Sequence, residues 1–172
     1  QWQRGLALMT QQSARMEHLV SDLLTLSRLE TSDFKAEAEP INVAELLNAI
    51  RLDALALSGH QHQLLLDIDT QLYLRGSATE LRSAFSNLVF NAVKYTPHGS
   101  IIELRWHHNQ DGAYLEVKDN GPGIDSKHLA FLTQRFYRVD SSRSSETGGT
   151  GLGLAIVKHV LLRHQGRLEI SS

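Results

Sequence analysis

The sequence predicts an α/β (α+β) two-layer sandwich that is preceded by one long amphipathic helix. Three observations predict this architecture. The first 30 residues contain no Pro and repeat apolar side chains at helical spacing. From residue 41 onward, helical and alternating patterns follow one another, as expected for one mixed sheet with helices on one face. The 172 residues, 41% of them hydrophobic, can bury one core without disulfide bonds, and the chain contains no Cys.

Changes in composition divide the chain into three parts. Residues 1–31 carry the long helix, residues 32–40 contain Ser, Asp, Glu and Pro as linkers do, and residues 41–172 form the α/β domain. The apolar stripe of the long helix consists of Leu6, Met9, Met16, Leu19, Val20, Leu23 and Leu26.

Local capping signals mark the helices of the α/β domain. Asn42 can cap a helix over 43–57, and Ser77 can cap a helix that runs until Pro97. Glu80, three residues after Ser77, would complete a capping box. Two further helices are predicted over 126–134 and 151–164.

Strands are predicted where short apolar runs are bounded by turn residues. Residues 62–69 and 71–75 are adjacent runs, which favours a pair of strands. Residues 100–107 and 113–118 alternate around an Asn-Gln-Asp-Gly turn. A last strand is predicted over 167–171.

Charge and hydropathy exclude several classes of protein. There are 17 Lys and Arg against 19 Asp and Glu, a net charge of −2, so nothing suggests nucleic acid as a partner. No run approaches the ~20 apolar residues that span a bilayer, and no signal peptide is recognisable. Because the chain opens on Gln1 and ends in an expected strand, we expect a piece of a longer protein, with a final strand after Ser172.

The predicted helix after Ser77 carries a polar stripe. Asn87 and Asn91 are four residues apart and share one face, which Lys94 continues. Amide oxygens can ligate Mg²⁺, and an ammonium can neutralise phosphate. A solvated helix face is the alternative interpretation.

Three other segments fit a nucleotide, although each has a simpler explanation. Asp119 to Gly123 could present a carboxylate beside closely approachable backbone, or form a plain tight turn. The glycines of 148–154 open a helix and could cradle phosphate, although they match neither a P-loop nor a dinucleotide fingerprint. Arg135 to Arg138 could anchor the polar loop 138–149, or supply aromatic side chains to the core.

The four segments, in this order, resemble the sensor histidine kinases of two-component systems. Residues 87–96 are similar to the N box of that family, 119–123 to the first glycine box, 135–138 to the F box and 149–153 to the second glycine box. Residues 16–30 resemble the second helix of the dimerisation hairpin. The amino-acid sequences of 87–97 and 135–159 most resemble those of the members of this family that belong to the phosphate regulon.

The resemblance implies a histidine-kinase/gyrase-type ATPase fold, with ATP and Mg²⁺ as cofactors. It implies phosphoryl transfer from Mg-ATP to a protein His and then to an Asp of a cognate response regulator. It also implies a homodimer through the helix of residues 1–30, in the cytoplasmic domain of a bacterial inner-membrane protein whose membrane segments lie outside this chain.

The same resemblance implies roles for single residues. Asn91 would be the Mg²⁺ ligand, Asp119 would be a buried carboxylate that accepts from the adenine amino group, and Tyr95 would pack against adenine. Arg138 would contact phosphate from the polar loop 138–149, which would form a lid over the site. The whole implied ATP-binding set is Asn87, Asn91, Lys94, Tyr95, Asp119, Gly121, Gly123, Arg138, Gly149, Thr150, Gly151, Leu152 and Gly153.

Two departures qualify the implied chemistry. Gyrase-type and MutL-type ATPases carry Glu where Asn87 stands, and an amide cannot serve as the base that activates water. None of the nine His is followed by an acidic residue and a nearby Pro, so we expect the phosphoacceptor and the first hairpin helix to be absent. A hydrolytic gyrase- or MutL-type ATPase and a nucleotide-sensing interaction module remain the alternative functions.

Overall fold

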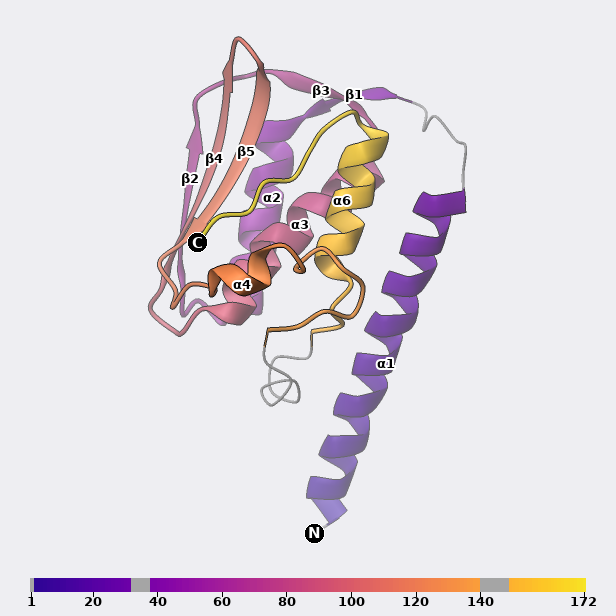
Figure 1. Ribbon diagram of the computed structural model, residues 1–172. Helices are drawn as coiled ribbons and strands as arrows, with labels where there is room; N and C mark the ends of the chain where they lie inside the picture. Colours follow the sequence, from indigo (N-terminus) through magenta and orange to yellow (C-terminus); the bar gives the residue numbers. More distant parts are fainter. Residues whose placement is uncertain (1, 32–37, 140–148) are drawn as a thin grey trace.

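A long helix stands beside an α/β body in the computed structural model, which describes residues 2–31, 38–139 and 149–172 (Figure 1). Helix α1 spans Trp2–Thr31, and its predicted extent is confirmed. The other helices are α2 (Val43–Leu57), α3 (Ala78–Tyr95), α4 (Ser126–Leu129) and α6 (Gly153–Arg163). The strands are β1 (Glu39–Asn42), β2 (Gln63–Ile68), β3 (Tyr73–Gly76), β4 (Ile101–Asn109) and β5 (Gly112–Asp119).

The described strands form two sheets, so the prediction of one mixed sheet is wrong in detail. Strands β2, β4 and β5 form a mixed sheet in which β2 is parallel to β4 and β4 is antiparallel to β5. The predicted pairing of β2 with β3 does not occur, because β3 pairs instead with β1, a strand that the sequence pattern did not reveal. Helix α3 supplies the crossover that parallel strands require.

Two predicted elements are shorter or absent. The helix expected over 126–134 ends at Leu129 and continues as turns, and the strand expected over 167–171 is not formed among the described residues. The loop expected over 138–149 lies largely outside the described residues.

The core lies between the three-stranded sheet and the helices α2, α3 and α6. Alternate residues of β4 point inward, and Ile102, Leu104 and Trp106 are buried while their neighbours reach the outer face. Val89 of α3 and Val157 of α6 are also fully buried. The predicted caps form: the side chain of Asn42 accepts from the Glu45 amide, and that of Ser77 from the Glu80 amide.

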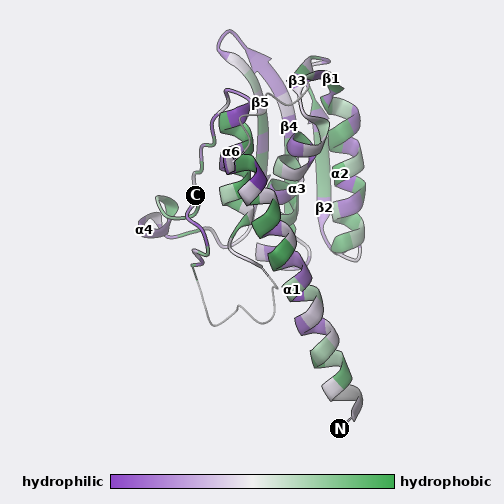
Figure 2. Ribbon diagram, turned by 90° about the vertical axis from the view of Figure 1, so that its right-hand side faces the viewer, coloured by the Kyte–Doolittle hydropathy of each residue, from purple (hydrophilic) through white to green (hydrophobic). Residues whose placement is uncertain are grey.

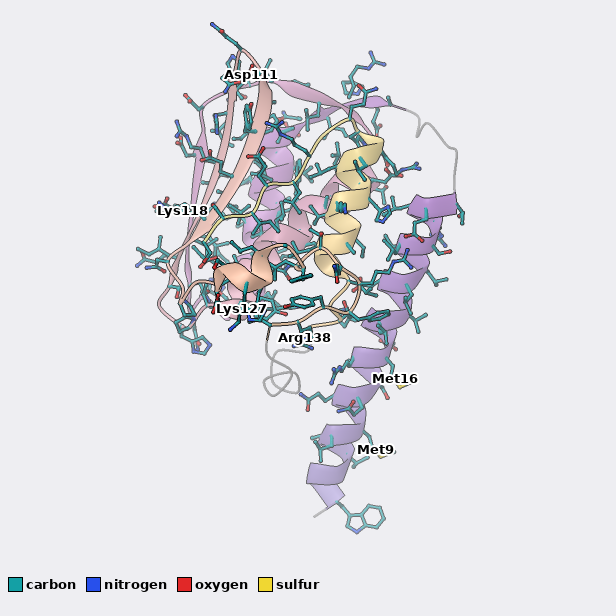
Figure 3. The ribbon with its side chains drawn as sticks, viewed as in Figure 1. Met9, Met16, Asp111, Lys118, Lys127 and Arg138 are labelled. Carbon is teal, nitrogen blue, oxygen red and sulfur yellow. The ribbon has the colours of Figure 1, made fainter. Side chains whose placement is uncertain are left out.

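Among the described residues, helix α1 contacts the body through its C-terminal half. Leu26 and Leu29 are buried where α1 packs on α6. Hydrophobic and hydrophilic residues alternate along the rest of the helix (Figure 2). Met9 and Met16, 70% and 66% exposed, project from it away from the body (Figure 3). No described helix is both long and apolar enough to cross a membrane.

Candidate nucleotide site

The polar stripe of α3 faces the start of α6. Asn87 and Asn91 are half-buried, and the Asn87 amide nitrogen donates to the Ser83 carbonyl at 2.9 Å, so its oxygen Oδ1 is directed toward α6. A Cβ added to Gly153 would lie 2.6 Å from that oxygen and 3.8 Å from the Asn91 amide nitrogen. The close packing of the N box and the second glycine box therefore requires glycine at position 153.

The start of α6 has no side-chain cap. Leu152, at the N-cap position, has a buried apolar side chain, and its own amide donates to the Thr150 hydroxyl at 3.3 Å. Gly151 has φ +75°, accepts from the Phe136 amide at 2.9 Å, and leaves no room for a Cβ beside the Phe136 backbone. A helix start without a side-chain cap offers its amides and the positive end of its dipole to an anion.

The first glycine box turns sharply at the end of β5. Asp119 Oδ1 accepts from the Gly121 amide at 2.9 Å. A Cβ at Gly121 would lie 2.7 Å from the Thr96 methyl carbon, so this turn rests on the end of α3. Gly123 adopts φ +77°, and the following amide, of Ile124, donates to the Ser172 hydroxyl.

Asp119 itself is exposed, and the expectation of a buried carboxylate is wrong. Its place at the last position of the edge strand β5 explains the exposure, since the described residues cover only one side of that strand's end. One carboxylate oxygen is held by the turn, and the other has no hydrogen-bond donor among the described residues, so it is available as an acceptor.

Tyr95 and Arg138 meet at the glycine that follows the undescribed segment. Arg138 Nη1 donates to the Gly149 carbonyl at 2.6 Å, and the Tyr95 hydroxyl would lie 2.8 Å from a Cβ at Gly149. Tyr95 is 51% exposed and Lys94, one residue earlier, is also exposed at the end of α3. These side chains border the same side of the body as the N box.

Residues of α1 that the sequence analysis did not single out contact two of the boxes. The Thr150 hydroxyl donates to an Asp22 carboxylate oxygen at 2.6 Å. Glu30 forms an ion pair with Arg135 of the F box and lies 3.4 Å from His159 of α6. No local pattern in α1 signals these contacts, because they join residues more than 100 positions apart.

The environment of His159 favours its neutral form. Partial burial, and then the positive charges of Arg135 and Lys158, lower the pKa of His159 below its ordinary value. Glu30 would act in the opposite direction, but its carboxylate is already paired with Arg135. At the contact between α1 and α6, the positive charge is therefore that of one arginine, and the neighbouring imidazole is favoured in its neutral form.

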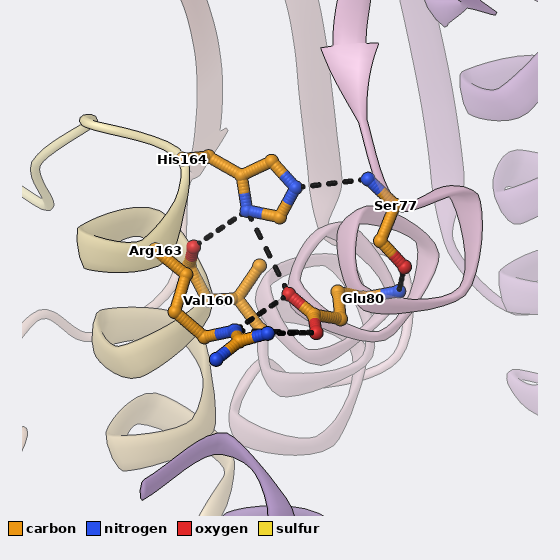
Figure 4. Close-up of polar contacts among 5 residues, drawn as sticks. All are labelled: Ser77, Glu80, Val160, Arg163 and His164. Atoms are coloured by element: carbon orange, nitrogen blue, oxygen red, sulfur yellow. Dashed lines mark hydrogen bonds and ion pairs between the residues drawn. The ribbon is translucent and has the colours of Figure 1, made fainter. Parts of the chain in front are cut away.

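A second polar cluster joins α3 and α6 at their other ends (Figure 4). Arg163 of α6 binds the Glu80 carboxylate, with Nε and Nη2 each 3.1 Å from a carboxylate oxygen. The imidazole of His164 accepts from the Ser77 amide at 3.1 Å and donates from Nδ1 to the Val160 carbonyl. Helices α3 and α6 contact each other at this cluster and again at Asn87 and Gly153. These two contacts fix the position of one helix relative to the other.

Comparison with known proteins identifies the class to which this fold and site belong. Residues 76–172, more than half of the chain, match the family described as "Histidine kinase-, DNA gyrase B-, and HSP90-like ATPase". The chain therefore belongs to this family of ATP-binding domains, and the predicted histidine-kinase/gyrase-type fold is confirmed.

Individual relatives show which members of this family the chain resembles. The chain is 59% identical over 172 residues to the "Phosphate regulon sensor protein PhoR" of Pseudomonas aeruginosa and 40% identical over 169 residues to the protein of the same name from Haemophilus influenzae. These matches cover 99% and 98% of this chain but 39% and 40% of the relatives, so the chain spans about two fifths of their length. A solved mycobacterial sensor histidine kinase, MprB, is 29% identical, with a TM-score of 0.65 over 74% of this chain and 80% of that one.

Proposed function

We propose that this chain is the catalytic ATP-binding part of a sensor histidine kinase that acts in phosphate-starvation signalling. The phosphate-regulon names of two similar proteins support the pathway. The contact of Gly153 with Asn87 carries the assignment of the site, since it brings the polar stripe of α3 to the open start of α6.

The proposed site has a phosphate end and a base end. At the phosphate end, the amides of Gly151 to Gly153 and the Lys94 ammonium would hold phosphate oxygens, and the Asn91 amide oxygen would ligate Mg²⁺. The residues fit these groups because the Asn87 side-chain oxygen and the Asn91 side-chain amide both lie beside Gly153 at the start of α6. Arg138, Gly149 and Thr150 would close this end from the lid.

At the base end, the second carboxylate oxygen of Asp119 would accept a hydrogen bond from the adenine amino group. Guanine carries an acceptor at that edge and would leave the carboxylate without a donor, at a cost in binding free energy. Gly121 and Gly123 allow the backbone to pass close to the base, and Tyr95 would cover it.

ATP supplies the γ-phosphoryl group in the proposed reaction, and the residues of this chain orient it without activating water. Asn87 stands on α3 beside the glycine box, and its amide cannot accept the proton that a hydrolytic base must take. Slow hydrolysis would preserve the phosphoryl group for a His on another segment and then for an Asp of a response regulator.

The domain organisation follows from the same proposal. Residues 1–31 would be the second helix of the dimerisation hairpin, 32–40 the linker and 41–172 the catalytic domain. The exposed side chains of α1 would be covered by a homodimeric helix bundle. The domain would lie on the cytoplasmic side of a bacterial inner membrane, held there by segments outside this chain.

A phosphotransfer assay tests the proposal. The chain is incubated with Mg-ATP labelled in the γ-phosphoryl group and with a separate helical hairpin that carries a His followed by an acidic residue and a nearby Pro. We expect an acid-labile, base-stable label on the hairpin. Rapid release of inorganic phosphate with no labelled hairpin would instead support a hydrolase.

A further inference from the structure

A buried histidine lies beneath the proposed base end of the site. His62 directly precedes β2 and is 6% exposed. Its ring nitrogen Nε2 lies 3.0 Å from the hydroxyl oxygen and 3.3 Å from the carbonyl oxygen of Thr96, the C-terminal cap of α3. This contact joins the start of the edge strand β2 to the end of the helix that carries the N box.

The hydrogen-bond pattern determines which nitrogen of His62 carries the hydrogen. The Thr96 hydroxyl donates its own hydrogen to the Ala92 carbonyl at 2.7 Å. The hydroxyl oxygen can therefore only accept from the imidazole, so His62 donates from Nε2. Its other nitrogen, Nδ1, is buried without a hydrogen-bond partner among the described residues.

An unpaired buried acceptor is unfavourable for stability. An aliphatic side chain would fill the same space without the desolvation cost of Nδ1. The hydrogen bond from Nε2 to Thr96 is what an aliphatic residue could not supply. Its consequence for the molecule therefore lies at Thr96.

Thr96 supports the first glycine box. Its methyl carbon would be 2.7 Å from a Cβ at Gly121, which means that the turn lies directly against this methyl group. The Gly121 amide in turn donates to Asp119 Oδ1 at 2.9 Å. Any rotation of the Thr96 side chain would move the turn and, with it, the carboxylate.

We infer that His62 is a positioning residue for base recognition, acting through Thr96 and Gly121 on Asp119. The inference rests on the proposed function of Asp119 as the acceptor for adenine. His62 does not itself contact the nucleotide. Together with the Ala92 carbonyl, it holds the Thr96 hydroxyl in one rotamer, so that the methyl group sets the position of the glycine turn.

The test compares three single variants of the full chain. His62→Phe keeps a planar buried ring and removes the donor, whereas His62→Gln keeps an N–H donor on a side chain of similar reach. His98→Ala is the matched control, because its ring lies 6.0 Å from that of His62 but is exposed and makes no described contact with Thr96. Binding of ATP and of GTP is measured by calorimetry with Mg²⁺, and hydrogen exchange is measured without nucleotide.

We expect His62→Phe to weaken ATP binding by about three- to tenfold, the effect of one lost hydrogen bond, and to reduce the preference for ATP over GTP. Amide exchange should accelerate at residues 119–123 and stay unchanged at 151–153. His62→Gln should restore most of the preference, and His98→Ala should leave it unaltered. Unchanged nucleotide preference in His62→Phe, or equal acceleration in both segments, would overturn the inference.

A fourth variant guards against loss of the fold. Thr96→Val keeps the methyl group and removes the hydroxyl with its bonds to both His62 and Ala92, so its effect should be at least as large as that of His62→Phe, and the double variant should be no worse than Thr96→Val alone. Additive effects would show that His62 does not act through Thr96. Failure of the unmodified chain to prefer ATP over GTP would overturn the Asp119 assignment itself, and this inference with it.

Discussion

Replacing Gly153 with Ala tests the packing between α6 and the N box. The added Cβ would lie 2.6 Å from Asn87 Oδ1. Ordinary carbon–oxygen contacts begin near 3.4 Å, so the oxygen must retreat by roughly 0.8 Å. It cannot retreat freely, because the amide of the same side chain donates to the Ser83 carbonyl.

The expected magnitude follows from two opposing effects. Inserting a methyl group into a packed contact costs about 1–3 kcal/mol. Replacing a helical Gly by Ala recovers about 0.5–1 kcal/mol. The difference between these ranges is about 0–2.5 kcal/mol, and we expect Gly153→Ala to lower the free energy of unfolding by about 1–2 kcal/mol, near the middle of that difference. ATP binding should weaken because Asn87 is displaced.

Urea denaturation of four variants measures this effect. Gly5→Ala is the matched control, since a Cβ there meets nothing within 4 Å and the same substitution should be neutral or slightly stabilising. In an Asn87→Ala background, Gly153→Ala should lose most of its penalty, because the obstructing oxygen is gone. A Gly153→Ala chain as stable as the parent in both backgrounds would refute the close contact.

Three further predictions concern the nucleotide and association. Asp119→Asn should weaken ATP binding measured by calorimetry without lowering the thermal midpoint, because the carboxylate is exposed and the Asn oxygen can still accept from the turn; a lower midpoint would indicate a structural role. Radiolabelled ATP should leave no acid-labile, base-stable label on this chain, and a label traced to any His would contradict the missing phosphoacceptor. Leu19→Glu combined with Leu23→Glu should abolish weak, concentration-dependent self-association in sedimentation experiments while ATP binding persists; a parent chain that stays monomeric at high concentration would show that α1 needs no partner.

Most of the helices were predictable because their signals are local, although the one expected over 126–134 ends at Leu129. The Asn42 and Ser77 caps form as the sequence indicates, since each side chain reaches an amide only three residues away. The capping box at Ser77 is only half formed, however. Glu80 turns to Arg163, and the Ser77 amide finds His164 instead, which no pattern near Ser77 could have revealed.

The strand pairings were not predictable to the same degree. The runs that became β2 and β3 are adjacent in sequence, yet β2 pairs with β4 beyond the α3 crossover and β3 pairs with β1. A period-2 pattern indicates which face of a strand is buried and carries no information about its neighbour. The strand expected over 167–171 has suitable residues, but among the described residues it has no paired neighbour.

For the site, the order of the motifs predicted more than any single motif did. In the structure, the glycine box at the start of α6 packs against Asn87. Arg138 contacts Gly149, and Gly149 lies beside Tyr95. The contacts that hold these residues in place could not be predicted from the sequence. His62 contacts Thr96, which is 34 positions away, and the residues around His62 have the pattern of an ordinary strand start.

The central claim is that the four boxes form a site for an adenine nucleotide, and a calorimetric titration of the unmodified chain tests it most directly. ATP and GTP are titrated separately in the presence of Mg²⁺, and the ATP titration is repeated with the metal chelated. We expect saturable, Mg²⁺-dependent binding of ATP in the micromolar range and little or no binding of GTP, because the second carboxylate oxygen of Asp119 requires a donor. Equal affinities for the two nucleotides, or no binding of either, would contradict the account.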